Sequence, residues 1–250
     1  MKLTKNNLKW WIIIAISPCL AIIYINQTAV VVALPKLQIE LGMNAVMQQW
    51  VINSYSLTLA VLILVGGRLS DIFGNRRSFL WGLSGLLIAS VLCGVAPNGA
   101  LLIIFRAIQG FFAALLIPNT SVVVMGAFPP EERGKAMGIY IGFSSVFLAL
   151  GPLIGGIFTE FLSWRLVFFI NLPFGLFSLF IALRTISKKK PPPTNNEINW
   201  VSVFFFSICY LLINCGAYGS SKFWLELTIN YRLIYFCYCL LYILFGLRSK

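Results

Sequence analysis

The sequence predicts an all-α integral membrane protein with eight transmembrane helices. The residues Ala, Val, Ile, Leu, Met, Phe, Trp, Tyr and Cys make up 59% of the 250 residues, charged residues make up 10%, and the mean hydropathy is +0.89. A soluble domain is about 45–50% apolar and about 25% charged, so this chain has too little polar surface to face water. The apolar residues also gather in runs of about twenty, the length at which a helix crosses a bilayer.

Eight apolar runs have this length, and turn residues separate them. The runs occupy residues 11–34, 48–66, 79–96, 101–125, 137–158, 166–185, 200–217 and 229–247. Pro97-Asn98-Gly99 separates the third run from the fourth, Pro129-Pro130 follows the fourth, and three prolines at 191–193 precede the seventh. All seven tryptophans lie at or just beyond the end of a run, as expected for aromatic residues at membrane interfaces.

The basic residues orient the predicted helices. With the N-terminus in the cytoplasm, fourteen of the nineteen Lys and Arg residues fall in cytoplasmic segments, four fall outside, and Arg106 lies within a span. This bias follows the positive-inside rule and predicts a multi-pass protein of the cell (plasma or inner) membrane with both termini cytoplasmic. The net charge of +12 then faces the anionic leaflet of the lipid bilayer, and no nucleic-acid partner is expected.

One polar stretch interrupts the apolar chain. Residues 186–199 are basic at first and then rich in Pro and Asn. We interpret this stretch as a cytoplasmic linker between residues 1–185, which hold six predicted helices, and residues 200–250, which hold two more.

The composition argues against an enzyme. The chain has no histidine, which removes the commonest general base and the commonest metal ligand. Its six cysteines lie inside apolar runs without a C-x-x-C pair, so we expect buried thiols rather than a metal or redox site. No Ser or Cys nucleophile has a partner base, and no loop is suited to hold phosphate, so we expect neither a cofactor nor ATP-driven transport.

Two loops match when the chain is shifted by 89 residues. Residues 66–73 (GGRLSDIF) align with residues 155–162 (GGIFTEFL), and Arg76 then falls on Arg165. The alternative is chance similarity in an apolar background. Because three spans, an odd number, separate the two loops, the copies face opposite sides of the membrane. The pattern favours an inverted-topology repeat, a feature of secondary transporters.

The loop between the second and third spans carries a motif of glycines and charges. It reads GRLSDIFGNRR over residues 67–77, with the pattern positions Gly67, Asp71, Gly74, Arg76 and Arg77. The two glycines allow a tight turn and close helix contact, and Asp71 with the arginines is suited to form a cytoplasmic clasp. We favour a conformational latch at Asp71 over a merely solvated loop acid.

Arg106 is the one charged residue in the middle of a span. Burying it costs about 2.5–3.5 kcal/mol on insertion scales, so it should face the bundle interior or a wet cavity, with Gln109 on the same helix face. Two roles stay open, a clamp on neighbouring carbonyls and a part in substrate or proton passage, and we favour the second. Asn26, Asn53 and Ser56 are suited to line the same cavity or to make polar contacts between helices.

The fifth span contains two pairs of helix-modifying residues. Gly151-Pro152 removes a backbone hydrogen bond and admits a kink, and Gly155-Gly156 lets a neighbouring helix pack tightly. Close packing alone accounts for both pairs.

Together with residues 26–35 at the end of the first span and residues 164–175 before the sixth, these motifs resemble the major facilitator superfamily, specifically its fourteen-helix drug:proton antiporter branch. The resemblance extends from Asn26 to Arg248. It implies a six-helix N-terminal bundle of two inverted three-helix repeats, then an extra helix hairpin, with the C-terminal half absent from this chain. It also implies efflux of small lipophilic or cationic compounds by alternating access, and a gating role for the Gly151-Pro152 motif.

Two residues depart from the pattern of that branch. An acidic residue usually stands at the position of Asn26, and a glycine at the position of Phe147. Because no Asp, Glu, His or Lys lies inside the eight predicted spans, we expect no membrane-embedded proton site in this chain. The sequence thus leaves two functions open: a secondary active antiporter for drugs, or a half-transporter that is inactive alone or needs a complementary C-terminal half from a second chain.

Overall fold

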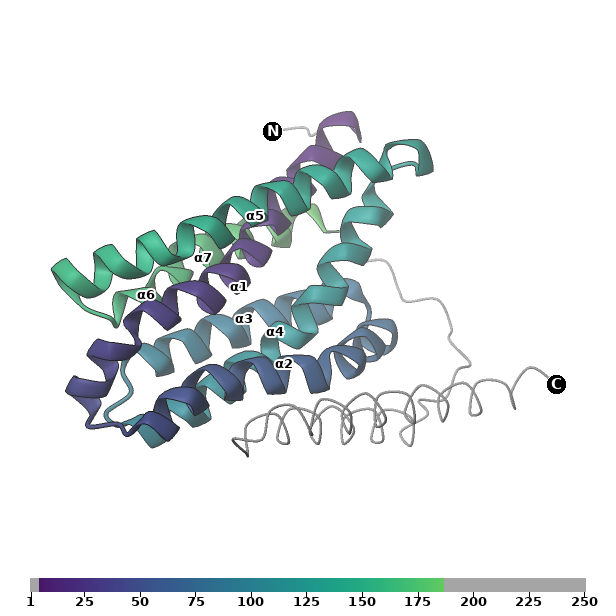
Figure 1. Cartoon of the computed structure of the whole chain (residues 1–250). Helices are drawn as coiled ribbons and strands as arrows, with labels where there is room; N and C mark the ends of the chain where they lie inside the picture. The colour runs from purple at the N-terminus through teal and green to yellow at the C-terminus, as the bar shows by residue number, and fades with distance from the viewer. Residues whose placement is uncertain (1–4, 187–250) are drawn as a thin grey trace, which may run out of the picture. The chain divides into compact units, whose positions relative to one another are not determined.

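The computed structural model describes residues 5–186, which form an all-α bundle (Figure 1). Within this part, six helical stretches are long and apolar enough to cross a membrane. The six spans predicted between residues 11 and 185 are therefore confirmed. The two spans predicted at 200–217 and 229–247, and all but the first residue of the predicted linker 186–199, lie outside the described residues.

The helices extend beyond the apolar runs because a helix continues into the interfacial region, whereas the runs mark only its hydrocarbon part. The elements are α1 (Lys5–Leu41), α2 (Ala45–Phe73), α3 (Asn75–Gly94), α4 (Gly99–Ala127), a 3₁₀ turn (Pro130–Glu132), α5 (Arg133–Ile157), a π-helical turn (Phe158–Leu162), α6 (Leu166–Phe169) and α7 (Asn171–Thr185). The sixth predicted helix is thus divided at Ile170 into the short α6 and the longer α7.

Asparagine and glycine residues set the turns between the helices. The side chain of Asn44 accepts a hydrogen bond from the Met47 N–H at the start of α2 (2.8 Å), and Asn98 caps α4 through the Leu101 N–H (2.9 Å). Gly74 alone joins α2 to α3 with φ +86°, a conformation that favours glycine. The predicted turn at Pro97-Asn98-Gly99 is therefore confirmed, with Asn98 as its cap.

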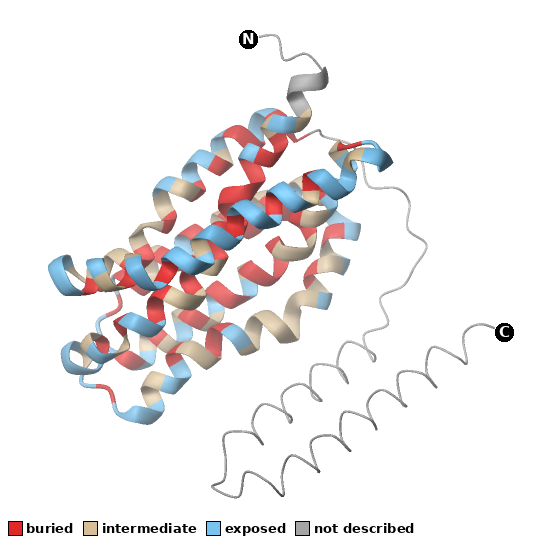
Figure 2. Ribbon diagram, turned by 45° about the horizontal axis from the view of Figure 1, so that its top comes forward, coloured by how far each residue is buried: buried red, intermediate tan, exposed pale blue. Residues whose placement is uncertain are grey.

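The helices pack in two groups that share the bundle interior. α1 packs against α5 and α7, while α4 packs against α2 and α3 (Figure 1). α1 also contacts α4 and so joins the two groups. Buried residues face inward, whereas much of the outer surface of α5 is exposed (Figure 2). The buried residues of α5 repeat at helical spacing on one face and are Ala136, Tyr140, Ser144, Gly151 and Gly155.

Two glycines set the close approach of α5 to α1. A Cβ atom on Gly155 would lie 2.6 Å from the carbonyl oxygen and 2.9 Å from the Cα atom of Ala29. A Cβ atom on Gly151 would overlap the side-chain oxygen of Thr28. At Gly155 the backbones of α1 and α5 lie against each other. A larger residue at this position would therefore force the two helices apart.

We expect Gly155→Ala to lower the stability of the bundle by about 1–3 kcal/mol, because the added methyl group must push α5 away from the α1 backbone. Thermal unfolding in detergent measures the effect. Gly138→Ala on the same helix is the matched control, since a Cβ there meets no atom within 4 Å. Equal unfolding temperatures for both variants would contradict this assignment.

Polar contacts tie the two ends of the bundle. At one end, here called the Lys9 end, Lys9 Nζ lies 2.6 Å from Glu132 Oε2 and joins α1 to the connection between α4 and α5. At the opposite end, the Glu40 end, Glu40 Oε2 accepts hydrogen bonds from Trp164 Nε1 (2.7 Å) and Arg165 Nη1 (3.3 Å). α1 is therefore held at both ends by residues from the second half of the bundle.

Candidate functional site

A cluster of polar side chains lies in the bundle interior, where α1, α3, α4 and α7 meet. Each of its side chains is at most 1% exposed. The members are Asn26, Ser90, Arg106, Gln109 and Asn171, here called the Arg106 cluster. The structure thus brings together three of the residues singled out from the sequence, Asn26, Arg106 and Gln109.

Neutral groups surround the guanidinium of Arg106. Its Nε atom donates to the Val51 carbonyl oxygen (3.1 Å), and its Nη1 atom donates to Gln109 Oε1 (2.8 Å). The guanidinium carbon lies 4.2 Å from the centroid of the Tyr55 ring, a cation–π contact. None of the ion pairs between described residues includes Arg106. Backbone and amide dipoles and the Tyr55 ring therefore stabilise its charge.

Two amide side chains connect Arg106 to α1, α3 and α7. Gln109 Nε2 donates to Ser90 Oγ (2.8 Å) and to Asn26 Oδ1 (3.4 Å). Asn171 Nδ2 donates to the same two acceptors, at 3.0 Å and 3.2 Å. Asn26 and Ser90 each therefore accept from two helices, and Gln109 links Asn26 to Arg106.

Three buried polar atoms near this cluster lack a hydrogen-bond partner within residues 5–186. They are Asn171 Oδ1, the Tyr55 hydroxyl and Ser54 Oγ. Leaving such a group unpaired costs about 1–3 kcal/mol. The cluster therefore combines a buried positive charge with polar groups that have no partner among the described residues.

Asn53 and Ser56, also singled out from the sequence, do not join the cluster. Asn53 is half-buried and Ser56 is exposed, and no described hydrogen bond links either one to Arg106. Conversely, the sequence did not single out Ser90 or Asn171. The signal for Ser90 is weak because a helical serine satisfies its own hydroxyl, as Ser90 does on the Leu86 carbonyl (2.9 Å).

The loop after α2 lies at the Lys9 end of the bundle. Arg68 Nη1 lies 4.0 Å from Asp71 Oδ2, and both side chains are about half exposed (52% and 53%). An exposed pair of this kind contributes little stability. Arg76 Nη2 instead donates to the Leu183 carbonyl at the end of α7 (2.9 Å), whereas Arg77 is exposed. Arg76 therefore fixes the loop on the bundle, while Asp71 stays open to a further partner.

The glycine and proline motif of α5 lies away from the Arg106 cluster. Gly151 and Gly155 pack on α1, Gly156 is half-buried, and Pro152 is exposed. Phe147, one turn before Gly151, packs edge-on against Phe174 of α7 with ring centroids 5.6 Å apart. The motif therefore shapes the contact of α5 with its neighbours, and α5 contributes no hydrogen bond to the cluster.

The described cysteines are Cys19 and Cys93, and both are buried and free. Cys19 Sγ lies 2.9 Å from Ser178 Oγ, which in turn donates to the Ala15 carbonyl. Over residues 5–186, no group of three or more His, Cys, Asp or Glu side chains is placed to hold a metal ion.

Comparison with known proteins matches this chain to transporters. A family model described as the Major Facilitator Superfamily matches residues 16–247. The puromycin resistance protein pur8 of Streptomyces alboniger is 41% identical over 172 residues, which cover 68% of this chain and 34% of that protein. The tetracenomycin C resistance and export protein of Streptomyces glaucescens is 31% identical over 215 residues, which cover 84% of this chain and 40% of that protein.

A solved structure shares the fold. A crystal structure of the peptide transporter POT in complex with sulfate superposes on 92% of this chain, and on 51% of its own, with a TM-score of 0.67 and 16% sequence identity. At this identity the likeness concerns the fold alone. The chain spans about a third to two fifths of the length of the two sequence relatives (34% and 40%).

Proposed function

Because the chain belongs to the major facilitator superfamily, we propose that it supplies the N-terminal bundle of a transporter that exports small lipophilic drugs by alternating access. The observation that carries this proposal is the Arg106 cluster, which holds the one charged side chain that is buried within the described bundle. Ionisable residues inside membrane segments are costly, and they mark substrate or ion pathways. The names of the two relatives, which refer to antibiotic resistance and export, support the same function.

The charge of the cluster narrows the substrate class. Arg106 is positive, and the described residues give it no carboxylate partner. We therefore propose that the Arg106 cluster, once a conformational change exposes it, binds a neutral or negatively charged part of a lipophilic compound. No acidic side chain belongs to the cluster, so a cationic substrate would need a carboxylate from elsewhere in the transporter.

Alternating access requires a second wall. In this class of transporter, two halves rock about a site at the middle of the bilayer, and one half cannot close both faces. We propose that the bundle works together with a C-terminal six-helix half, either in one longer protein or from a complementary chain. The 34–40% share of the relatives' length supports this reading. The alternative is a half-transporter that is inactive on its own.

The loop after α2 and the motif of α5 are proposed to control the conformational change. Asp71 is half-exposed and weakly paired, so it is free to bind a helix of the second half as a latch. Gly151 and Gly155 keep the α1–α5 contact free of large side chains, which suits a gate in which one helix shifts along the other.

Two helix crossings support the proposed inverted repeat. A Cβ atom on Gly66 of α2 would overlap the Ala114 carbonyl oxygen of α4, just as one on Gly155 of α5 would press on the Ala29 carbonyl oxygen of α1. Gly66 and Gly155 are equivalent in the 89-residue repeat. We propose that α1–α3 and α4–α7 are copies of one unit, and that the linker and two further helices follow them.

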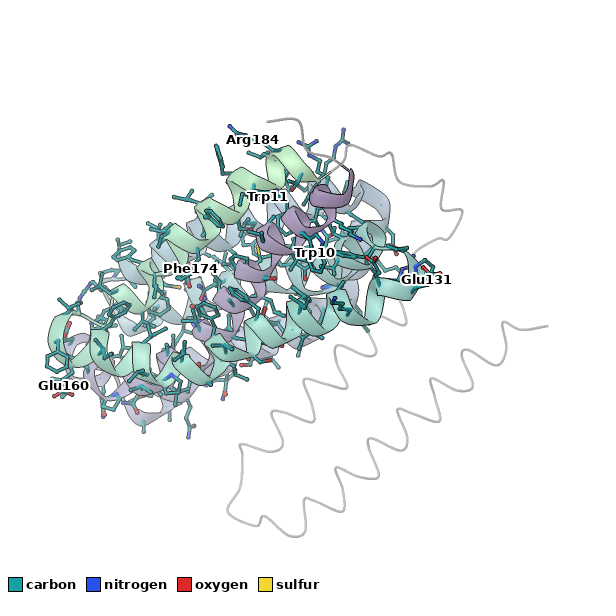
Figure 3. All side chains as sticks on the ribbon, turned by 90° about the horizontal axis from the view of Figure 1, so that it is seen from above. Trp10, Trp11, Glu131, Glu160, Phe174 and Arg184 are labelled. Atoms are coloured by element: carbon teal, nitrogen blue, oxygen red, sulfur yellow. The ribbon has the colours of Figure 1, made fainter. Side chains whose placement is uncertain are left out.

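We also propose that the Lys9 end faces the cytoplasm of the cell. The basic residues near that end include Lys9, Arg68, Arg76, Arg77, Arg133, Lys135 and Arg184, whereas the Glu40 end has Lys36 and Arg165. Figure 3 shows Glu131 and Arg184 far from Glu160, as this division requires. The excess follows the positive-inside rule.

Whether position 26 takes part in coupling drug efflux to protons can be tested directly. Asn26 Oδ1 already accepts hydrogen bonds from Gln109 and Asn171, so a carboxylate at this position keeps both hydrogen-bond donors. Only the Gln109 side chain would then separate the carboxylate from Arg106. In a transporter completed with a C-terminal half, Asn26→Asp should increase drug efflux driven by an imposed pH gradient several-fold. Asn53→Asp, on a half-buried residue outside the cluster, should have no such effect.

Efflux from membrane vesicles is measured for both variants with and without the gradient. Equal responses for Asn26→Asp and Asn53→Asp would exclude Asn26 from the coupling pathway. The proposed export itself fails if the completed parent transporter moves no lipophilic drug under any gradient.

A further inference from the structure

The turn between α2 and α3, residues 70–75, carries Asp71, and its own hydrogen bonds set its shape. The Gly74 N–H donates to the Ser70 carbonyl oxygen (3.0 Å), and Ser70 Oγ donates to Asn75 Oδ1 (3.0 Å). Both bonds join the end of α2 to the start of α3. Neither of them holds the turn on the rest of the bundle.

Two side chains connect this turn to other helices. Arg76 ties it to the end of α7 at an exposed position, as described above. Asn119 of α4 ties it to the interior, because this residue is 0% exposed and its Nδ2 donates to the main-chain carbonyl oxygen of Asn75 at 2.8 Å. That oxygen also accepts from the N–H four residues later in the helix, so α3 does not need a side-chain donor there. The bond therefore fixes the turn on α4 rather than satisfying an orphan carbonyl.

The arrangement is unfavourable for stability. Asn119 Oδ1 is buried and has no hydrogen-bond partner among the described residues. An unpaired buried oxygen commonly costs more than one neutral hydrogen bond contributes. A leucine has nearly the same shape as asparagine and would leave no oxygen unpaired. The position of the turn therefore explains Asn119 better than stability does.

The end of α2 is held on the same part of α4. Pro118, directly before Asn119, lacks an N–H group, so the Ala114 carbonyl lacks its helical donor. A Cβ atom on Gly66 would overlap that carbonyl oxygen, and one on Gly67 would lie 3.7 Å from the Pro118 Cβ atom. The end of α2 and the start of α3 therefore both lie against α4 close to its proline.

We propose that Asn119 is a positioning residue for Asp71. It holds the α2–α3 turn on α4 and so places the carboxylate where the second half of the transporter binds it. The inference rests on the latch function proposed above for Asp71. It adds a link to the bundle interior, because α4 also carries Arg106 and Gln109.

Hydrogen exchange measured by mass spectrometry tests the positioning role on the full 250-residue chain in lipid nanodiscs. In Asn119→Leu, the backbone amides of residues 70–76 should exchange about three- to tenfold faster, the factor expected for the loss of one hydrogen bond. The variant should unfold at or above the parent's temperature, because the unpaired oxygen is removed. A merely structural asparagine would instead lower the unfolding temperature and speed exchange throughout the bundle.

Two further variants keep this test decisive. Ser121→Ala is the matched control on the same helix, since Ser121 Oγ donates only to the Ile117 carbonyl of α4 (3.4 Å), and it should leave exchange of the turn unchanged. If Asn119→Leu fails to fold, Asn119→Ser serves in its place. A helical serine bonds to its own helix, and its shorter side chain does not reach α3.

Drug efflux by the transporter completed with a C-terminal half tests the link to Asp71. Asp71→Asn and Asn119→Leu should each reduce efflux several-fold. The double variant should be no worse than the more impaired single variant, because both changes act on the same latch.

The outcomes separate this inference from the proposed latch. Unchanged exchange of residues 70–76 in Asn119→Leu would overturn the positioning role, whatever the efflux. Fully additive losses of efflux in the double variant would show that Asn119 acts independently of Asp71 and would also overturn it. Normal efflux by Asp71→Asn would overturn the latch itself.

Discussion

Replacing Arg106 with methionine should reduce drug efflux by a completed transporter about ten- to hundredfold, the range expected when hydrogen bonds from a charged group are lost. Methionine fills much of the same space, so the bundle should still fold. The variant leaves Gln109 Oε1 without its donor at 2.8 Å, which costs about 1–3 kcal/mol. Removing a buried charge offsets part of that cost.

Arg106→Lys separates charge from geometry. Lysine keeps the positive charge but lacks the planar fork that reaches both the Val51 carbonyl and Gln109 while it stacks on Tyr55. We expect Arg106→Lys to be nearly as impaired as Arg106→Met. Lys135→Met, at an exposed position at the start of α5, is the control and should transport normally.

Efflux of a lipophilic dye from cells and thermal unfolding of the purified proteins are measured together. Normal efflux by Arg106→Met at reduced stability would assign Arg106 to a purely structural clamp on the α2 carbonyl.

Much of the fold could be predicted because its causes are local. Span length follows from bilayer thickness, and the turns at Gly74 and Asn98 follow from backbone preferences of single residues. The pairing of Arg106 with Gln109 follows from their spacing of three on one helix. Each of these needs only the neighbouring sequence.

The rest depends on how distant helices meet. Asn171 reaches the Arg106 cluster from α7 and Ser90 from α3, and although Asn171 lies in the motif at 164–175, nothing in either local sequence indicates a contact with Arg106 or Gln109. Asn53 has the right residue type on α2 yet stays outside the cluster. An apolar groove lined by residues of α1, α5 and α7 likewise depends on how these three helices pack. Tertiary packing of this kind is not encoded in the spacing of polar residues along one helix.

We also expect transport to require both halves of the transporter. We expect the 250-residue chain to insert into membranes as a folded bundle but to transport no substrate. A single bundle holds the Arg106 cluster in its interior and, on its own, has no second half to rock against. Fusion to a C-terminal six-helix half of a related exporter should restore flux, and Arg106→Met should reduce that flux about ten- to hundredfold.

The most direct test is uptake of a lipophilic drug into liposomes that contain either the purified 250-residue chain or its fusion to the C-terminal half. The two proteins are reconstituted at equal amounts under the same imposed pH gradient, with the Arg106→Met fusion as the matched inactive control. We expect saturable, drug-dependent flux with the fusion and none above protein-free liposomes with the chain alone. Robust saturable flux through the 250-residue chain alone would instead show that one bundle suffices for transport.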